Sequence, residues 1–118
     1  MKTKSYQTHD WVEEFPGAVT VCDIDGNIVE MNGRAKATFA KDGGEKLIGK
    51  NLRDCHPPAV RVQIDDMLAS GEKNVYTIEK NGVRKLIYQT PWYKDNERMG
   101  LVEISLEIPE KMRHFKRG

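Results

Sequence analysis

Cys55 and His56 are adjacent, and their side chains form the most chemically capable pair in this sequence. A thiolate and an imidazole both bind zinc or haem iron. Structural zinc sites generally need about four ligands, and the other histidines, His9 and His114, stand near the two ends of the chain. We therefore expect a buried cysteine, a histidine that hydrogen-bonds the turn before Pro57, and no metal site. A haem or metal ligand at His56 is the less favoured alternative.

Paired carboxylates are the other candidates for catalysis, because two neighbouring acids can divide the acid and base roles. Asp23 and Asp25 flank a predicted turn, and Asp65 and Asp66 fall on the predicted solvent side of a helix. Neither pair is accompanied by a nucleophile with a base and a third group that orients it. The sequence predicts that the protein is not an enzyme.

The composition is that of one ordinary domain. A chain of 118 residues suits a single hydrophobic core, and a formal net charge of +1 supplies no overall attraction to nucleic acid or to an anionic membrane. No apolar run approaches the roughly 20 residues that cross a bilayer, and residues 1–10 lack the apolar segment of a secretory signal. We expect a cytoplasmic protein, with free thiols at Cys22 and Cys55 and with neither nucleic acid nor membrane as a partner.

Two dipeptides that tolerate positive φ angles predict tight hairpins. Asp25-Gly26 lies between two runs rich in Val and Ile within 18–31, and Asn81-Gly82 joins the predicted strands 74–79 and 83–90. Asn32 follows the first hairpin and is the predicted N-cap of a helix over 33–40. A short helix over 11–15 precedes the hairpin, with Thr8 or Asp10 as its cap.

The longest predicted helix covers 58–69. Pro58 suits its first turn, and an apolar stripe recurs along one side at Val60, Ile64, Met67 and Leu68. The last predicted strand covers 100–108 and alternates, with Ile104 and its apolar neighbours on a side predicted to be dry and Glu103 on a side predicted to be polar. Helix, two strands, several helices and three strands in this order predict an α+β fold with an antiparallel sheet.

Over residues 15–109 the chain resembles the PAS family of small sensory domains. The resemblance is carried by Phe15–Asn32, by Leu47–Leu52 and by the closing three strands. It implies a five-stranded antiparallel sheet of order 2-1-5-4-3, covered on one face by short helices and one longer helix, with a pocket between that helix and the sheet. Residues 1–14 are then an N-terminal helical flank, and residues 110–118 a basic, solvated tail. Pro91 would fall late in the fourth strand, so we expect a bulge or a strand end there.

The same resemblance narrows the choice of possible cofactors. Light-sensing members that bind flavin are similar to this chain at Gly49-Lys-Asn51 but place their reactive cysteine directly after that Asn, where this chain has Leu52. Haem-binding members carry an axial histidine in the long helix, and 58–69 contains none. A flavin adduct is therefore not expected, haem stays a minor alternative through His56, and the cofactor is otherwise left open.

We predict a mostly apolar cavity for a small ligand of apolar or mixed polarity. Its expected lining is Phe39, Cys55, His56, Val60, Ile64, Met67, Tyr88, Trp92 and Ile104. The alternative is that these side chains fill the core and leave no room for a ligand.

The N-terminal flank carries the predicted dimer contacts, because Trp11, Val12 and Phe15 form one apolar edge. We expect a homodimer that senses a small molecule and passes the signal in trans to a separate partner protein. A dimerisation or docking module without a ligand is the alternative, and a haem or metal gas sensor through His56 is the third candidate.

Overall fold

The computed structural model describes residues 9–118. Its sheet is antiparallel and five-stranded, in the order β2-β1-β5-β4-β3, which confirms the predicted order. The strands are β1 (Ala18–Asp23), β2 (Ile28–Met31), β3 (Asn74–Lys80), β4 (Val83–Lys94) and β5 (Glu97–Glu107). The α-helices are α1 (Asp10–Glu13), α2 (Gly33–Thr38) and α3 (Pro58–Ser70), and short 3-10 helices η1 (Ala40–Asp42), η2 (Gly44–Leu47) and η3 (Leu52–Cys55) connect α2 to α3.

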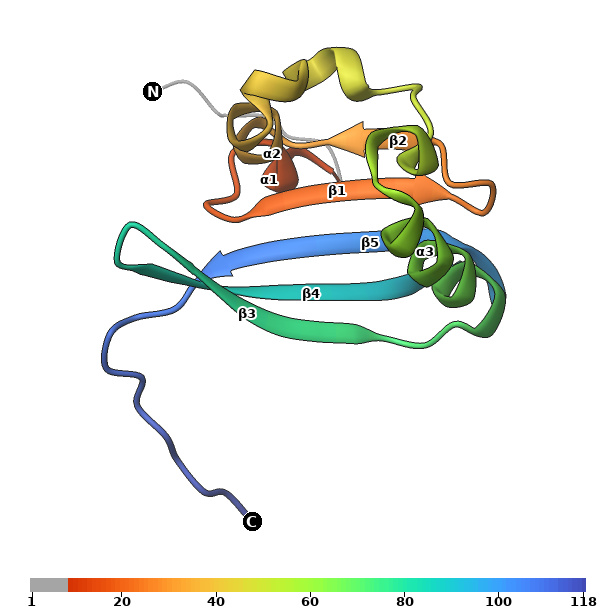
Figure 1. Cartoon of the computed structure of the whole chain (residues 1–118). Helices are drawn as coiled ribbons and strands as arrows, with labels where there is room; N and C mark the ends of the chain where they lie inside the picture. The colour runs from red at the N-terminus through yellow and green to blue at the C-terminus, as the bar shows by residue number, and fades with distance from the viewer. Residues whose placement is uncertain (1–8) are drawn as a thin grey trace, which may run out of the picture.

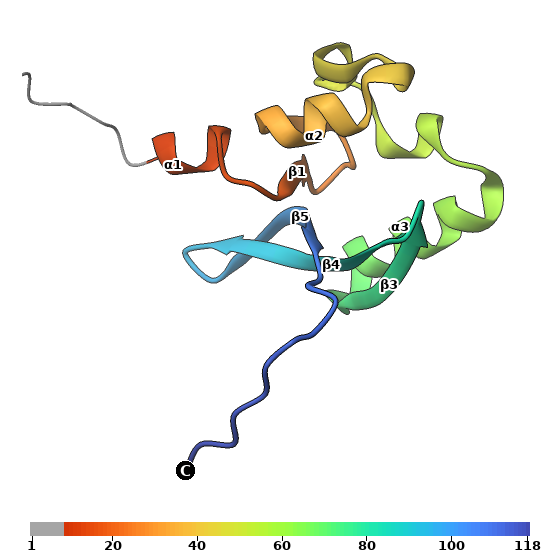
Figure 2. The ribbon, with the colours of Figure 1, turned by 90° about the vertical axis from the view of Figure 1, so that its left-hand side faces the viewer.

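One face of the sheet is covered by an arc of helical turns that runs from α2 to α3. Figure 1 shows α3 lying in front of the strands and α2 close to β1 and β2. In Figure 2, turned by 90°, α1 stands away from this arc. We call the face under α3 the inner face and the opposite one the outer face.

Both predicted hairpins form, and local backbone geometry explains each. Asn81 and Gly82 both have positive φ angles, of 53° and 78°, as a two-residue turn between twisted strands requires. In the first hairpin Gly26 has a φ of 87°, and the carboxylate of Asp23 accepts hydrogen bonds from the backbone N–H groups of Asp25 and Asn27 at 3.0 and 2.9 Å.

Helix α3 begins and ends where Pro58 and Gly71 predict. Pro58 occupies its first position, and Gly71 ends it in the left-handed region with a φ of 76°. Ile64, Met67 and Leu68 are buried against the sheet. The short helix α1 is capped differently from our expectation: His9 is its N-cap and makes no side-chain cap hydrogen bond. Thr8 and the rest of residues 1–8 of the predicted flank lie outside the described residues.

The core has two clusters of buried side chains on the inner face. One joins β1, β2, α2 and η2, and the other joins α3 to β1 and β5. Leu52 packs against both clusters. Thr20 lies on β1 between Ala18 of the first cluster and Cys22 of the second, and it pairs with Glu103 of β5.

Two expectations about the last strands need correction. The structure puts Glu103 on the inner face and Ile104 on the outer face, the reverse of the predicted dry and polar sides. Alternation tells which side chains share a face, but which face the helices cover depends on distant packing. The irregularity expected at Pro91 lies between Trp92 and Tyr93, where the β4–β5 register shifts, and Pro91 itself stays paired with Leu101.

After β5 the basic tail leaves the sheet as an exposed chain, visible in Figure 1. Its Arg113 guanidinium lies 4.7 Å from the centre of the Phe115 ring. Within residues 9–118, no helix has the length and apolar character needed to cross a membrane.

Candidate ligand-binding site

A cavity of about 590 Å³ lies between α3 and the inner face of the sheet. Its volume is in the range of small-molecule sites, roughly 300–1,000 Å³. Its lining comprises Thr20, Cys22, Phe39, Leu52, His56, Val60, Gln63, Ile64, Met67, Asn74, Tyr76, Gln89, Leu101, Val102 and Glu103.

A second hollow of about 330 Å³ shares Thr20, Phe39, Leu52, His56 and Glu103 with the cavity, so the two adjoin. It extends toward β2 and η2. Its remaining lining residues are Ile28, Met31, Asp42, Leu47, Lys50 and Cys55.

The roof of the cavity is apolar because of the helical period of α3. Val60, Ile64 and Met67 recur at intervals of four and three residues, so they point to one side of the helix. Leu52 of η3 and Leu101 of β5 add further apolar side chains to the lining.

The floor of the cavity is polar because one row of side chains runs across the sheet. Asn74 pairs with Gln89, Gln89 with Glu103, and Glu103 with Thr20, so these residues lie side by side on β3, β4, β5 and β1. Asn74 Nδ2 donates to Gln89 Oε1 at 2.8 Å, and Gln89 Nε2 donates to Glu103 Oε1 at 3.0 Å. We call these four residues the polar row.

The far end of the polar row is incompletely satisfied. The Thr20 hydroxyl is buried and has no hydrogen-bond partner among the described residues. Glu103 uses one carboxylate oxygen to accept from Gln89, and its side chain makes no other hydrogen bond or ion pair within residues 9–118. Buried polar groups are normally satisfied, so this end of the row has capacity for a further partner.

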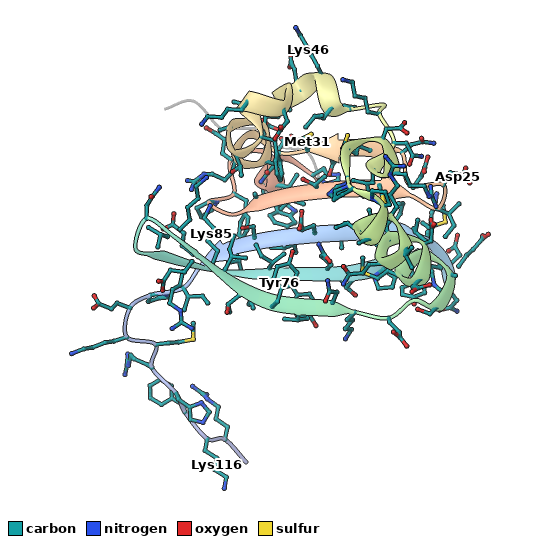
Figure 3. All side chains as sticks on the ribbon, in the orientation of Figure 1. Asp25, Met31, Lys46, Tyr76, Lys85 and Lys116 are labelled. Atoms are coloured by element: carbon teal, nitrogen blue, oxygen red, sulfur yellow. The ribbon has the colours of Figure 1, made fainter. Side chains whose placement is uncertain are left out.

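Two titratable groups on the cavity wall are held neutral. Burial, and secondly the charge of Glu103, raise the pKa of the Tyr76 phenol. Burial is also the largest cause that raises the pKa of the Cys22 thiol. In Figure 3, Tyr76 lies on β3, which is one edge strand of the sheet, and Met31 lies on β2, the other edge strand. The wall therefore offers a neutral phenol, a neutral thiol and a carboxylate.

His56 lines both hollows at the end of η3. Its Nδ1 lies 2.6 Å from the carbonyl oxygen of Leu52, and because a carbonyl can only accept, Nδ1 carries the proton and donates. In the neutral ring the lone pair then stands on Nε2. No group of three or more His, Cys, Asp and Glu side chains suited to a metal ion occurs within 9–118.

The structure brings part of the predicted lining together. Phe39, His56, Val60, Ile64 and Met67 line the cavity, and Cys55 lines the adjoining hollow. Cys55 is exposed, so the expectation that it is buried was wrong.

Tyr88, Trp92 and Ile104 line neither hollow, which corrects the predicted lining. Tyr88 pairs with Ile104, and the two residues are adjacent in sequence to Gln89 and Glu103 of the polar row. Successive residues of a strand point to opposite faces, so Tyr88 and Ile104 point to the outer face. Trp92 instead donates from Nε1 to the Cys22 carbonyl oxygen at 2.9 Å.

Sequence reasoning missed the polar row altogether. Gln89 and Glu103 stand at alternate positions to apolar residues, a pattern that also describes a solvent-facing side. The pairing of the Gln89 amide with the Glu103 carboxylate across β4 and β5 would have revealed the row, but recognising that pairing requires the register of the two strands.

The predicted dimer contacts differ in exposure. Trp11 is 66% exposed and Val12 only 7%. Trp11 packs edge-to-face against Phe15, with ring centres 5.8 Å apart. A Cβ built on Gly17 would lie 2.8 Å from Phe15 and 2.6 Å from Leu106 of β5, so both side chains close over that glycine.

Comparisons with known proteins agree with this geometry. A family model described as the PAS fold matches residues 12–113. No curated protein matches the chain. The PAS domain of an HTR-like protein from Haloarcula marismortui has a TM-score of 0.58 at 18% identity, covering 83% of this chain and 86% of that one.

Two further structures have similar scores. The PAS domain of BvgS from Bordetella pertussis has a TM-score of 0.60 at 18% identity, covering 86% of this chain and 84% of that one. The Aer2 receptor from Vibrio cholerae, described as a dual PAS–haem oxygen sensor, has a TM-score of 0.57 at 17% identity, covering 79% of this chain and 95% of that one. At these identities the likeness concerns the fold alone.

Proposed function

The chain belongs to the PAS family, whose domains are sensory modules common in signalling proteins, and on that premise we propose that it binds a small molecule in the cavity under α3. The observation that carries the proposal is the cavity itself, about 590 Å³ with an apolar roof and a polar floor that is incompletely satisfied at its Thr20 end. Binding there would change the packing of α3 on the sheet, because α3 supplies the roof.

We further propose that a second copy and a separate partner protein read this change. The exposed aromatic edge at Trp11 supports a contact between copies, since exposed aromatic side chains are enriched at interfaces. The outer face adds exposed apolar side chains, Val75 at 47% and Leu106 at 36%. We place the protein in the cytoplasm, which its free thiols at Cys22 and Cys55 support.

The experiment is native mass spectrometry of freshly purified protein, with a pair of variants on α3. Val60 lines the cavity, whereas Val62, two residues further along the same helix, is 61% exposed. We expect a bound small molecule in the wild type, its loss in Val60→Trp, whose indole occupies the cavity, and its retention in the control Val62→Trp. Retention of the molecule in Val60→Trp would contradict binding in this cavity.

A docking module without a ligand is the second candidate, favoured by the exposed Trp11, which packs against the half-buried Phe15. It predicts a dimer with no bound molecule, and it predicts that Trp11→Ala weakens the dimer while both Val60→Trp and Val62→Trp leave it intact. The same mass spectra therefore separate the two candidates.

A haem sensor is the third candidate, favoured by the free lone pair on His56 Nε2. Haem bound there would supply visible absorption and an iron able to bind gases. An absorption spectrum of the purified protein, compared with that of His56→Gln, tests this candidate. A haem band that disappears in the variant would replace our first proposal.

A further inference from the structure

The hydrogen bonds of the polar row have one direction. The Glu103 carboxylate can only accept, so Gln89 must present its Nε2 to it, as the 3.0 Å distance shows. Gln89 Oε1 then faces Asn74 and accepts from Nδ2 at 2.8 Å. The two hydrogen bonds therefore both point from β3 toward β5, and this chain of hydrogen bonds ends on the Glu103 carboxylate.

Beyond that carboxylate the acceptors outnumber the donors. Glu103 retains an oxygen without a hydrogen-bond partner within residues 9–118. Next to it on β1, the unpartnered Thr20 hydroxyl adds two lone pairs and one donor. If Thr20 donates to Glu103, its own lone pairs still lack a donor. The missing component is a group with several donors.

No cation of the described chain neutralises this site. The ion pairs His9–Glu30 and Arg53–Asp65 lie elsewhere. Lys50 and His56 line the adjoining hollow without forming an ion pair to Glu103. The Glu103 carboxylate therefore has no counter-charge among the described residues, and a cationic group in the cavity could pair with it.

We propose that the ligand of this cavity carries a cationic nitrogen group with several N–H donors, such as an alkylammonium or amidinium, bound to Glu103 and Thr20. Its apolar body lies under Val60, Ile64 and Met67. The inference rests on the proposed function and names the chemical class of the ligand. An anionic group at the same place would face Glu103 directly, so the cavity also discriminates against acids.

The test uses three probes that share one apolar body: benzylammonium, benzyl alcohol and phenylacetate. Each is titrated into the full chain at neutral pH, with binding measured by calorimetry and located by amide NMR spectra. We expect benzylammonium to bind at least about tenfold more tightly than benzyl alcohol, as one charge-assisted hydrogen bond warrants. The shifted amide signals should belong to the polar row and to α3, and phenylacetate should bind most weakly.

Glu103→Gln removes the charge and keeps an acceptor for Gln89. In this variant the preference for benzylammonium over benzyl alcohol should vanish, while the affinity for benzyl alcohol stays the same. Glu107→Gln is the matched control, since Glu107 is an exposed residue of the same strand outside both hollows. It should retain the preference.

Several outcomes would overturn the inference. Tighter binding of benzyl alcohol or phenylacetate than of benzylammonium in the wild type does so without any variant. So does an undiminished preference in Glu103→Gln, and so does a failure of all three probes to shift signals of the cavity. The proposed function is judged separately, by the molecule retained in wild type and lost in Val60→Trp.

Discussion

The side-chain amide of Asn32 donates a hydrogen bond of 2.9 Å to the carbonyl oxygen of Val12, and so ties α1 to the first hairpin. The same amide donates to Gly17 at 2.8 Å. Its Oδ1 accepts from the backbone N–H groups of Val19 and Ala35 at 2.9 and 3.0 Å. Asn32 is only 1% exposed, so one buried side chain joins α1, β1 and α2 and has every hydrogen-bonding position filled.

Asn32→Ala should destabilise the protein strongly. It leaves buried backbone groups without partners, and each such group costs about 1–3 kcal/mol, so we expect a loss of at least about 3 kcal/mol in the free energy of unfolding. Urea unfolding measures this. Thr38→Ala, an exposed change on the same helix, should cost far less. Equal losses in the two variants would show that Asn32 has no such joining role.

Gly100 allows β5 to pass close to β1. Its φ is 153°, and a Cβ there would overlap the Cys22 carbonyl oxygen and lie 2.7 Å from the carbonyl carbon of Asp23. The Trp92 indole, opposite Gly100 on β4, hydrogen-bonds the same Cys22 oxygen at 2.9 Å. A side chain at this position must therefore push two strands apart.

Gly100→Ala is accordingly predicted to lower the free energy of unfolding by about 3 kcal/mol or more. Gly82→Ala is the matched control. Gly82 also has a positive φ, of 78°, but nothing lies within 4 Å of its would-be Cβ, so only the backbone cost of roughly 1–2 kcal/mol applies. Thermal unfolding of both variants gives the comparison, and the prediction fails if Gly100→Ala is the milder of the two.

The elements predicted best from sequence are those whose signals are local. Asn81-Gly82 specifies its turn through its own φ angles, Asn32 caps α2 through the N–H of Ala35 three residues on, and Pro58 suits the first turn of α3. Each of these features depends only on residues that are close together along the chain, so the local sequence is enough to predict it. The sheet order, by contrast, came from the resemblance to the PAS family.

The floor of the cavity could not be predicted in this way. Thr20 and Glu103 are neighbours only because β1 and β5 pair in one register, and no local pattern fixes that register. The alternation around Ile104 is visible in the sequence, but alternation does not say which side the helices cover. The predicted lining therefore took Tyr88 from the outer face and omitted Gln89 beside it.

The two cysteines should differ sharply in reactivity. Cys22 is 2% exposed and burial raises the pKa of its thiol, whereas Cys55 is exposed. Because the thiolate is the reactive form, iodoacetamide at neutral pH should label Cys55 readily in the native protein and Cys22 only after unfolding. Mass spectrometry of peptides from native and urea-unfolded samples measures both. Equal native labelling would contradict the burial of Cys22.

The raised pKa of Cys22 also predicts a pH dependence. The folded thiol holds its proton to a higher pH than the unfolded thiol, whose reference pKa is 9.0. As the pH rises above that value the unfolded state loses a proton that the folded state keeps, so the free energy of unfolding falls. Cys22→Ala should reduce this decline and Cys55→Ala should not. Urea unfolding at pH values on both sides of the reference pKa provides the measurement.

Arg98 of β5 holds the C-terminal end of α3. Its guanidinium donates to the carbonyl oxygens of Leu68, Ala69 and Ser70 at 3.1, 2.7 and 3.2 Å. These carbonyls have no partner within the helix and form the negative end of its dipole. The link matters for sensing, because it anchors to the sheet the same helix that roofs the cavity, close to the lining residue Met67.

Arg98→Met should therefore loosen the last turn of α3 while keeping an apolar side chain of similar length. We expect the Gly71 amide, which donates to the Met67 carbonyl oxygen at 2.9 Å, to exchange its hydrogen roughly ten times faster, as the loss of about 1.5 kcal/mol from a charged hydrogen bond implies. Hydrogen-exchange NMR measures this residue by residue. Arg84→Met, an exposed change on β4, is the control and should leave that amide unaffected. If exchange at Gly71 is the same in both variants, Arg98 does not restrain the C-terminal end of the helix.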